Sequence, residues 1–384
     1  MKGFAIAAVV MMVVLQAQSQ PRFFFTAKQC RDSVSQQLKQ QVDRTIALPL
    51  HDSTYQRWMG AYWAMELMLY QPSGYEQLIP VQIAMLPKTG PGFQRAFMEM
   101  LYTLYLNRYD AELKVILPQL KSDKVKAMVL EYLSASGTTP IVSTDPTFTR
   151  SSYYPLYQYQ RSKKEQALPS RNDFLHSSFL PGQTVLCSFQ STDRNNPGYL
   201  MIRLADGTWM KNEQGEELRF PQLARSISNL PFYLTNGNTP QGLYKITGVD
   251  TSDNNWIGPT TNLQMILPFE KNASDFFGTD TSFENYYSLL LGHHLQRFTG
   301  LKESYWAGKM GRTEIIAHGT TIDPEYYKHQ LYYPNTPSLG CLCSPEIWNE
   351  NGERIYSAQA QWMGYIVNKR LQPSYLIVAE LIDF

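Results

Sequence analysis

The chain has 384 residues, of which 43% are apolar and 17% are charged, and its formal net charge is +1. This composition excludes a disordered chain, and the length is enough for two or three domains of about 100–200 residues each. Because basic and acidic side chains balance, the chain lacks the positive field typical of nucleic-acid binding, and we expect no nucleic acid among its partners.

The first segment has the features of a secretory signal peptide. A single basic residue, Lys2, precedes an uninterrupted apolar run at residues 4–15, and residues 17–19 (Ala-Gln-Ser) have the small-x-small form of a cleavage site. The run is shorter than the ~20 apolar residues that span a bilayer, although an uncleaved anchor is the alternative interpretation. We therefore predict a signal peptide at residues 1–19. After its removal, we expect an exported protein, periplasmic or associated with the cell wall, without an integral membrane segment.

Residues 20–136 are predicted to form an all-α domain. Four segments there carry apolar residues at every third or fourth position, and Pro, Gly and Asp residues separate them. These segments are residues 32–48, 53–70, 91–107 and 123–136. They are short and closely connected, as in stacked helical hairpins. Because we find no catalytic pattern in this domain, we expect a docking or spacer role, with a protein partner as one option. A ligand-binding groove is the alternative.

Residues 137–180 are predicted to be a linker followed by an irregular segment. Residues 137–150 are rich in Thr, Pro and Ser, which is typical of a linker. Residues 151–180 are polar and rich in tyrosine, with no pattern that assigns them to a helix or a strand.

Residues 181–384 are predicted to form a mainly-β domain with peripheral helices, so that the whole chain is an α+β multidomain protein. Short segments rich in β-branched and aromatic residues alternate with Gly, Asn or Asp turns. The expected strands are residues 184–190, 198–204, 207–212, 229–235, 242–249 and 374–382. We also expect helices at residues 283–298 and 353–367, and a helix that begins at Ser344 with this serine as its cap.

The four cysteines allow three pairings, and in an exported protein paired cysteines are the default. A bridge between Cys341 and Cys343 would be strained, because normal disulfide geometry does not suit a Cys-x-Cys loop. A bridge between Cys30 and Cys187 remains open, since nothing in the sequence shows that the two residues lie close together.

Three short motifs follow one another in the predicted β-domain. They are Thr-Pro-x-Gly-x-Tyr at residues 239–244, His-Gly-Thr at 318–320 and Ser-x-Gly-Cys at 338–341. In this order the motifs resemble the catalytic domain of the YkuD-type L,D-transpeptidases, and the resemblance covers roughly residues 180–384. It implies a cysteine acyl-transferase that acts on peptidoglycan tetrapeptide stems and needs no metal or organic cofactor. An L,D-carboxypeptidase or a protein-anchoring enzyme with the same site is the alternative.

Cys341 is the predicted nucleophile, and His318 is the predicted general base and acid. A free thiol is only a few per cent thiolate near pH 7, so it needs a base to react. The resemblance implies that the carbonyl of Gly319 orients the imidazole. The amides of Gly340 and Cys341 are expected to face the developing oxyanion, and the helix predicted at Ser344 would add a small stabilisation of the thiolate.

Other residues near the motifs are expected to support the site. Ser338 is expected to hold the shape of the loop through its hydroxyl, and Thr320, the last residue of the His-Gly-Thr motif, is expected to support the site as well. Cys343 stands where the family usually has arginine or asparagine, which leaves the choice of substrate in doubt. In the insert between the histidine and the nucleophile, we expect Tyr332 and Tyr333 either to line the acceptor side or to pack on the edge of the domain.

Three other interpretations remain. One is a cell-wall-binding scaffold with impaired catalysis, which the unusual Cys343 supports. Another is an exported thiol-redox protein that uses Cys341 and Cys343. The third is a zinc site that adds His318 and His329 to the two cysteines, but the spacing fits no zinc signature, so we expect no metal.

Overall fold

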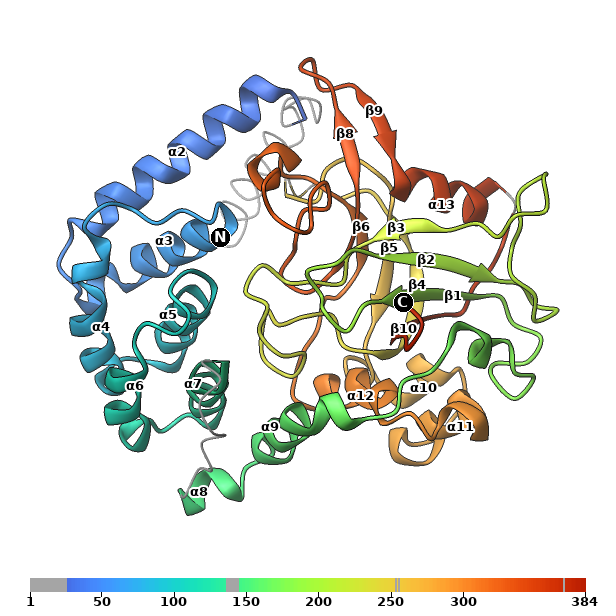
Figure 1. Ribbon diagram of the computed structural model, residues 1–384, viewed down its shortest axis with the longest axis horizontal. Helices are drawn as coiled ribbons and strands as arrows, with labels where there is room; N and C mark the ends of the chain where they lie inside the picture. The colour runs from blue at the N-terminus through green and yellow to red at the C-terminus, as the bar shows by residue number, and fades with distance from the viewer. Residues whose placement is uncertain (1–25, 136–144, 253, 255, 369) are drawn as a thin grey trace, which may run out of the picture.

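The computed structural model describes residues 26–135, 145–252, 254, 256–368 and 370–384. It has a mixed α/β architecture, in which an N-terminal helical region lies beside a nearly closed β-sheet (Figure 1). The predicted signal peptide at residues 1–19 and the linker residues 137–144 lie outside the described residues. Within the described ranges, no helix combines the length and the apolar character needed to cross a bilayer.

The helical region is built from short helices, with α3 packed against α2 and α5, and α5 packed against α7. Its helices are α2 (Lys28–Ile46), α3 (Tyr55–Leu67), α4 (Ile79–Met85), α5 (Pro91–Leu104), α6 (Asp110–Ile116) and α7 (Asp123–Ala135). The four predicted segments are confirmed as α2, α3, α5 and α7. α5 shows why the periodicity predicts a helix: Phe93, Phe97 and Leu101 recur every fourth position and are all buried.

Residues 145–175, which were expected to be the end of the linker and most of an irregular segment, form helices instead. They contain α8 (Pro146–Thr149), α9 (Tyr153–Ser162) and a 3-10 turn (Arg171–Leu175). α9 joins the two regions through its tyrosines. The Tyr157 hydroxyl lies 2.9 Å from Ser134 Oγ in α7, and the Tyr159 hydroxyl donates to Glu303 at 3.0 Å in the sheet region. The prediction of an irregular segment is therefore wrong here.

Most strands of the described chain belong to one sheet. They are β1 (Val185–Gln190), β2 (Gly198–Arg203), β3 (Phe220–Gln222), β4 (Gly242–Asp250), β5 (Asn262–Ile266), β6 (Ala317–Gly319), β7 (Leu342–Ser344) and β10 (Tyr375–Glu380). Their order is β3-β2-β1-β10-β4-β5-β6-β7, and β8 (Glu346–Trp348) pairs separately with β9 (Arg354–Ser357). Neighbouring strands are antiparallel except for the pairs β1–β10 and β6–β7.

The last strand of the sheet folds back towards the first. Leu223, which follows β3, exchanges both backbone hydrogen bonds with Cys343 of β7, at 2.7 and 2.9 Å. This bridge nearly closes the sheet and holds Cys343 between β6 and the end of β3.

Helices cover the outside of the sheet (Figure 1). They are α10 (Ala273–Phe277), α11 (Phe283–Leu295), α12 (Glu303–Lys309) and α13 (Ala358–Asn368). β1 is buried on both faces. In β1, Val185, Cys187 and Phe189 belong to the apolar cluster that contains α11, whereas Leu186 points to the cluster shared with the helical region.

Four local predictions in the sheet region are wrong. The first part of the helix expected at residues 353–367 is strand β9, and the helix begins only at Ala358. Residues 207–212 and 229–235 do not form strands. The second segment is apolar because it packs against the helical region, where the Tyr233 hydroxyl donates to Glu131 of α7 at 2.6 Å. No helix begins at Ser344, since this residue ends β7 and Glu346 begins β8. The expected helix dipole beside the nucleophile is therefore absent, because pairing with β6 keeps this segment extended.

Candidate active site

The register of two parallel strands places His318 next to a cysteine, and that cysteine is Cys343. His318 of β6 pairs with Cys343 of β7, and the imidazole Nε2 lies 3.6 Å from Cys343 Sγ. Cys341 comes just before β7, and its Sγ lies 3.5 Å from the carbonyl oxygen of Glu314. Among the described contacts, the predicted pair of Cys341 and His318 is thus not joined by a hydrogen bond.

The backbone around His318 decides which ring nitrogen can act as a base. Nδ1 lies 2.6 Å from the Gly319 carbonyl oxygen, which is the contact that the resemblance implies. Assigned from this contact, the proton is on Nδ1 and Nε2 keeps its lone pair. The side chain is 6% exposed, and burial lowers the pKa of the imidazole, although the Gly319 contact opposes this effect. His318 is therefore neutral at pH 7, with its basic nitrogen directed at the Cys343 thiol.

The two thiols near the histidine differ in their surroundings. Cys343 is 2% exposed, and burial raises the pKa of its thiol well above the ordinary value. Cys341 is half-buried. Desolvation raises the pKa of the Cys341 thiol, while the Ile316 N–H and the Arg312 guanidinium act in the opposite direction. Cys341 is thus the thiol that a substrate reaches more easily, and Cys343 is the thiol that lies closer to the base.

Arg312 is a buried cation beside Cys341 that no sequence motif marks. Its side chain is 7% exposed. The guanidinium donates to the carbonyls of Phe232, Gly237 and Asn238 at 2.6, 3.0 and 2.8 Å. Burial lowers its pKa to about 10, so it remains charged at pH 7. Since no carboxylate of the described residues forms an ion pair with Arg312, its charge is free to stabilise a thiolate or an oxyanion nearby.

Gly340 allows this cation to approach the loop. Its φ is 121°, and a Cβ added there would lie 2.3 Å from Arg312 Nη2 and 2.7 Å from the Gly237 carbonyl oxygen. On its other side, the Gly340 carbonyl accepts a hydrogen bond from Thr239 Oγ1 at 2.8 Å. The Thr-Pro-x-Gly motif therefore lies against the loop that carries Cys341.

The two amides expected to face an oxyanion differ in their availability. The Gly340 N–H donates to Ser338 Oγ at 3.0 Å, and the Ser338 hydroxyl donates to the Cys341 carbonyl at 2.8 Å. Ser338 thus holds the shape of the loop, as expected, but its hydroxyl oxygen also occupies the Gly340 N–H as a hydrogen-bond acceptor. The Cys341 N–H meets no acceptor among the described residues, which leaves it as the available donor of the two.

A second missed residue, Glu346, lies behind the histidine motif. A Cβ on Gly319 would lie 2.2 Å from the Glu346 Cδ atom, so the carboxyl packs directly against this glycine. Glu346 is fully buried, Oε1 accepts from Ser357 Oγ at 2.5 Å, and burial raises the pKa of the carboxyl to about 7. Thr320, just after β6, also binds the segment of Glu346, because its Oγ1 accepts from the Glu346 N–H at 3.1 Å. These contacts fix the position of the strand that carries His318.

The two tyrosines predicted at the substrate edge lie in different environments. Tyr332 is 4% exposed, and the Arg225 guanidinium lies over its ring, 4.8 Å from the centroid. Tyr333 is half-buried, and its hydroxyl donates to Glu325 at 3.2 Å. The buried Tyr332 packs inside the insert and offers little surface to a substrate.

The insert between His318 and Cys341 is docked on the helical region. The Tyr327 hydroxyl donates to the Leu67 carbonyl at the end of α3. Arg31 of α2 forms a buried ion pair with Asp323 at 3.0 Å. The helical region therefore holds the segment that connects the candidate base to the candidate nucleophile.

The four cysteines are free thiols in this structure, so neither of the bridges considered from the sequence is formed. Within the part of the chain that the structure describes, no three His, Cys, Asp or Glu side chains converge to hold a metal ion.

The site thus combines a neutral imidazole, two thiols and a buried cation. Such a set can deprotonate a thiol and stabilise negative charge on a nearby carbonyl oxygen. No family model, no curated protein and no solved structure matches the chain.

Proposed function

We propose that the protein is an exported cysteine acyl-transferase that acts on peptidoglycan tetrapeptide stems and joins the third residues of two stems. The observation that carries the proposal is the neutral imidazole of His318, held by the Gly319 carbonyl with Nε2 facing a thiol. A histidine in this arrangement can accept a thiol proton. The resemblance of the ordered motifs to the YkuD-type L,D-transpeptidases supplies the substrate class.

In the proposed reaction, Cys341 attacks the carbonyl of the third stem residue. Its side chain first rotates towards His318, and Nε2 takes the thiol proton as the S–C bond forms. The Cys341 N–H and Arg312 stabilise the negative charge on the carbonyl oxygen. The C–N bond to the terminal D-alanine then breaks, and the imidazolium gives its proton to the leaving amine.

The thioester is resolved by a second nucleophile. An amine of another stem forms the new peptide bond, releases the Cys341 sulfur and gives its proton to His318. Water in place of the amine would produce a trimmed stem, which is the L,D-carboxypeptidase alternative. An amine on a protein would produce an anchored protein.

A second candidate is a cell-wall-binding scaffold with impaired catalysis. It is favoured by the position of Cys341 Sγ, which lies against the Glu314 carbonyl and not against the imidazole. Cys343, which occupies the position of the family's usual polar residue, contacts Nε2 in its place. This candidate predicts binding to stems without turnover.

The test is analysis of the muropeptides formed when the protein acts on sacculi that contain tetrapeptide stems. The wild type should produce cross-linked products, Cys341→Ala should produce none, and Cys343→Ser should keep part of the activity. Identical profiles for wild type and Cys341→Ala would refute the proposal. Activity that survives in Cys341→Ala and disappears in Cys343→Ser would assign the nucleophile to Cys343.

A further inference from the structure

The hydroxyl of Thr239 contacts the peptide group that precedes the candidate nucleophile. Thr239 is 0% exposed, and its Oγ1 donates to the Gly340 carbonyl at 2.8 Å. This carbonyl belongs to the same peptide group as the Cys341 N–H. The peptide bond is trans, so its C=O and its N–H point in opposite directions within one plane. A hydrogen bond that fixes the carbonyl therefore also fixes the direction of the Cys341 N–H.

The Cys341 N–H is the amide that the nucleophile loop leaves free. It meets no acceptor in the part of the chain that the structure describes, whereas Ser338 Oγ occupies the Gly340 N–H. After the loop, the Leu342 N–H donates to the Ile316 carbonyl at 3.0 Å. A donor stabilises an oxyanion only when it is directed at the position where the negative charge develops. The direction of the Cys341 N–H therefore matters for the chemistry of the site.

The backbone of Thr239 is held on both sides. Its N–H donates to the Ala224 carbonyl at 3.2 Å, and its carbonyl accepts from Arg194 Nη1 at 3.3 Å. The same Nη1 donates to the Ala224 carbonyl at 3.0 Å. The guanidinium thus ties Thr239 and Ala224 together, and all three residues are buried.

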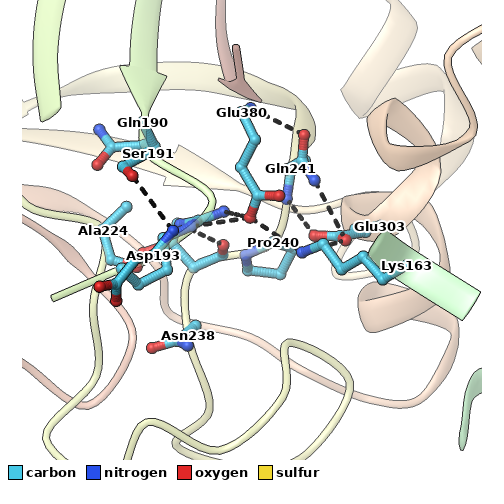
Figure 2. A network of polar contacts seen from close by, with 12 residues as sticks. Lys163, Gln190, Ser191, Asp193, Ala224, Asn238, Pro240, Gln241, Glu303 and Glu380 are labelled. Carbon is cyan, nitrogen blue, oxygen red and sulfur yellow. Dashed lines mark hydrogen bonds and ion pairs between the residues drawn. The ribbon is translucent and has the colours of Figure 1, made fainter. Parts of the chain in front are cut away.

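A buried group of charges keeps this part of the chain in place. Figure 2 shows Lys163, Glu303 and Glu380 around Gln241. Glu380 accepts from Arg194 Nε and Nη2 at 3.0 and 2.9 Å, and from Lys163 at 2.9 Å. Lys163 also pairs with Glu303 at 2.9 Å, and Glu303 accepts from the Gln241 N–H at 3.0 Å. Because removal of one partner from a buried ion pair is strongly destabilising, these contacts fix the segment that carries the threonine hydroxyl.

We propose that Thr239 is a positioning residue of the acyl transfer, whose hydroxyl directs the Cys341 N–H at the oxyanion of the tetrahedral intermediate. The inference deepens the proposed function and rests on its assignment of Cys341 as the nucleophile. Thr239 acts through the peptide group between Gly340 and Cys341. Without the hydroxyl, this peptide group turns and the amide loses its alignment, while the thiol keeps its surroundings.

The test compares two reactions of the Cys341 thiolate in the full chain. With p-nitrophenyl acetate, Sγ attacks the ester carbonyl, an oxyanion forms, and p-nitrophenolate leaves with the electrons of the C–O bond. With iodoacetamide, Sγ displaces iodide and no oxyanion forms. Both reactions need the thiolate, so the ratio of the acylation rate constant to the alkylation rate constant reports stabilisation of the oxyanion. Peptide mapping assigns each product to its cysteine.

Three variants of Thr239 separate the hydroxyl from the rest of the side chain. Thr239→Val and Thr239→Ala remove the hydroxyl, and the ratio at Cys341 should fall about tenfold. This is less than the roughly 10²–10³-fold loss that follows removal of an oxyanion donor, because the amide is misdirected but still present. Thr239→Ser keeps the hydroxyl and should keep the wild-type ratio.

The matched control is Thr89→Val in the helical region. Thr89 is buried, and its Oγ1 donates to the Leu86 carbonyl at 2.9 Å. The control therefore loses the same kind of hydrogen bond at a distance from the nucleophile loop, and its ratio at Cys341 should equal that of the wild type.

Cys30 in α2 provides an internal reference in the wild type. It is half-buried, and its N–H donates to the Ala27 carbonyl at 3.1 Å, so its own amide is not free for an oxyanion. The ratio at Cys341 should exceed the ratio at Cys30 by about tenfold. Far-UV circular dichroism checks the folding of each variant, and this comparison keeps the test decisive if the variants without the hydroxyl fail to fold.

An unchanged ratio in Thr239→Val and Thr239→Ala would overturn the inference, even if both rate constants fell together, because a merely structural role slows the two reactions alike. An equal loss in Thr239→Ser would show that the hydroxyl is not the cause. Equal ratios at Cys341 and Cys30 would overturn the inference too, since no amide would then favour the oxyanion at Cys341. The probes are not stem peptides, so a negative muropeptide result refutes the proposed substrate and leaves this inference standing.

Discussion

Replacing the buried Glu346 with glutamine should make the protein more stable at alkaline pH and leave its stability at acid pH nearly unchanged. Burial raises the pKa of this carboxyl from the usual 4.5 to about 7. Between these values the folded protein keeps the proton that the unfolded chain releases. The free energy of unfolding of the wild type therefore falls as the pH rises from about 4.5 to about 7, and the loss is complete above 7.

The size of the effect follows from the same values. A rise of the pKa from 4.5 to about 7 corresponds to about 3 kcal/mol in the free energy of unfolding. Glutamine resembles the protonated carboxyl and can still accept from Ser357, so Glu346→Gln escapes this loss. At pH 4.5 we expect the free energy of unfolding of Glu346→Gln to lie within about 1 kcal/mol of the wild-type value. At pH 8 it should exceed the wild-type value by up to ~3 kcal/mol.

The assay is urea denaturation of both proteins at half-unit steps from pH 4.5 to 8.5. Other buried carboxyls, such as Glu131, titrate in the same window, but they are present in both proteins and cancel in the difference. The difference in free energy should grow with pH by at most about 1.4 kcal/mol per unit. A difference that stays constant over the whole range would refute the assignment of a raised pKa to Glu346.

Three further predictions concern the nucleophile loop and its support. Arg312→Gln should shift the pH profile of Cys341 alkylation by about one unit to higher pH, because a nearby cation favours the thiolate. Arg312→Lys keeps the cation and should retain most of the wild-type profile. Unchanged profiles in both variants would exclude an electrostatic role of Arg312. Gly340→Ala should lower the free energy of unfolding by about 1–3 kcal/mol and abolish the reactivity of Cys341. The reason is that φ is positive at this position and the Arg312 guanidinium leaves no space for a methyl group. A thermal stability equal to that of the wild type would contradict this prediction. Tyr327→Phe should lower the free energy of unfolding by about 1 kcal/mol, because the hydrogen bond to the Leu67 carbonyl is lost. The same change should speed proteolysis of the insert between His318 and Cys341. Equal digestion rates of variant and wild type would show that this contact does not hold the insert in place.

Local patterns predicted much of the secondary structure. The helices α5 and α7 and the strands β1 and β10 have an unambiguous period and lie where they were expected. The segment 229–235 was misassigned because its apolar residues contact the distant helical region, which a local window cannot reveal. The start signal at Ser344 failed because tertiary strand pairing overrode a local cap preference.

The candidate site, too, could be predicted from the sequence only in part. The order of the motifs led to His318 and to its contact with the Gly319 carbonyl. A Cys-x-Cys spacing places both side chains on one face of a strand, but only the register of β6 and β7 decides which of them meets the imidazole. Arg312 and Glu346 could not be found, because a single buried charge has no period and no spacing to mark it.

The most direct test of the central claim is incubation of the reduced, folded protein with a carbapenem, followed by intact mass measurement and peptide mapping. We expect one adduct, on Cys341, which is lost in Cys341→Ala and strongly slowed in His318→Ala. Cys343→Ser should still react at Cys341. No adduct, or an adduct carried by Cys343, would contradict the assignment of Cys341 as the nucleophile that His318 activates.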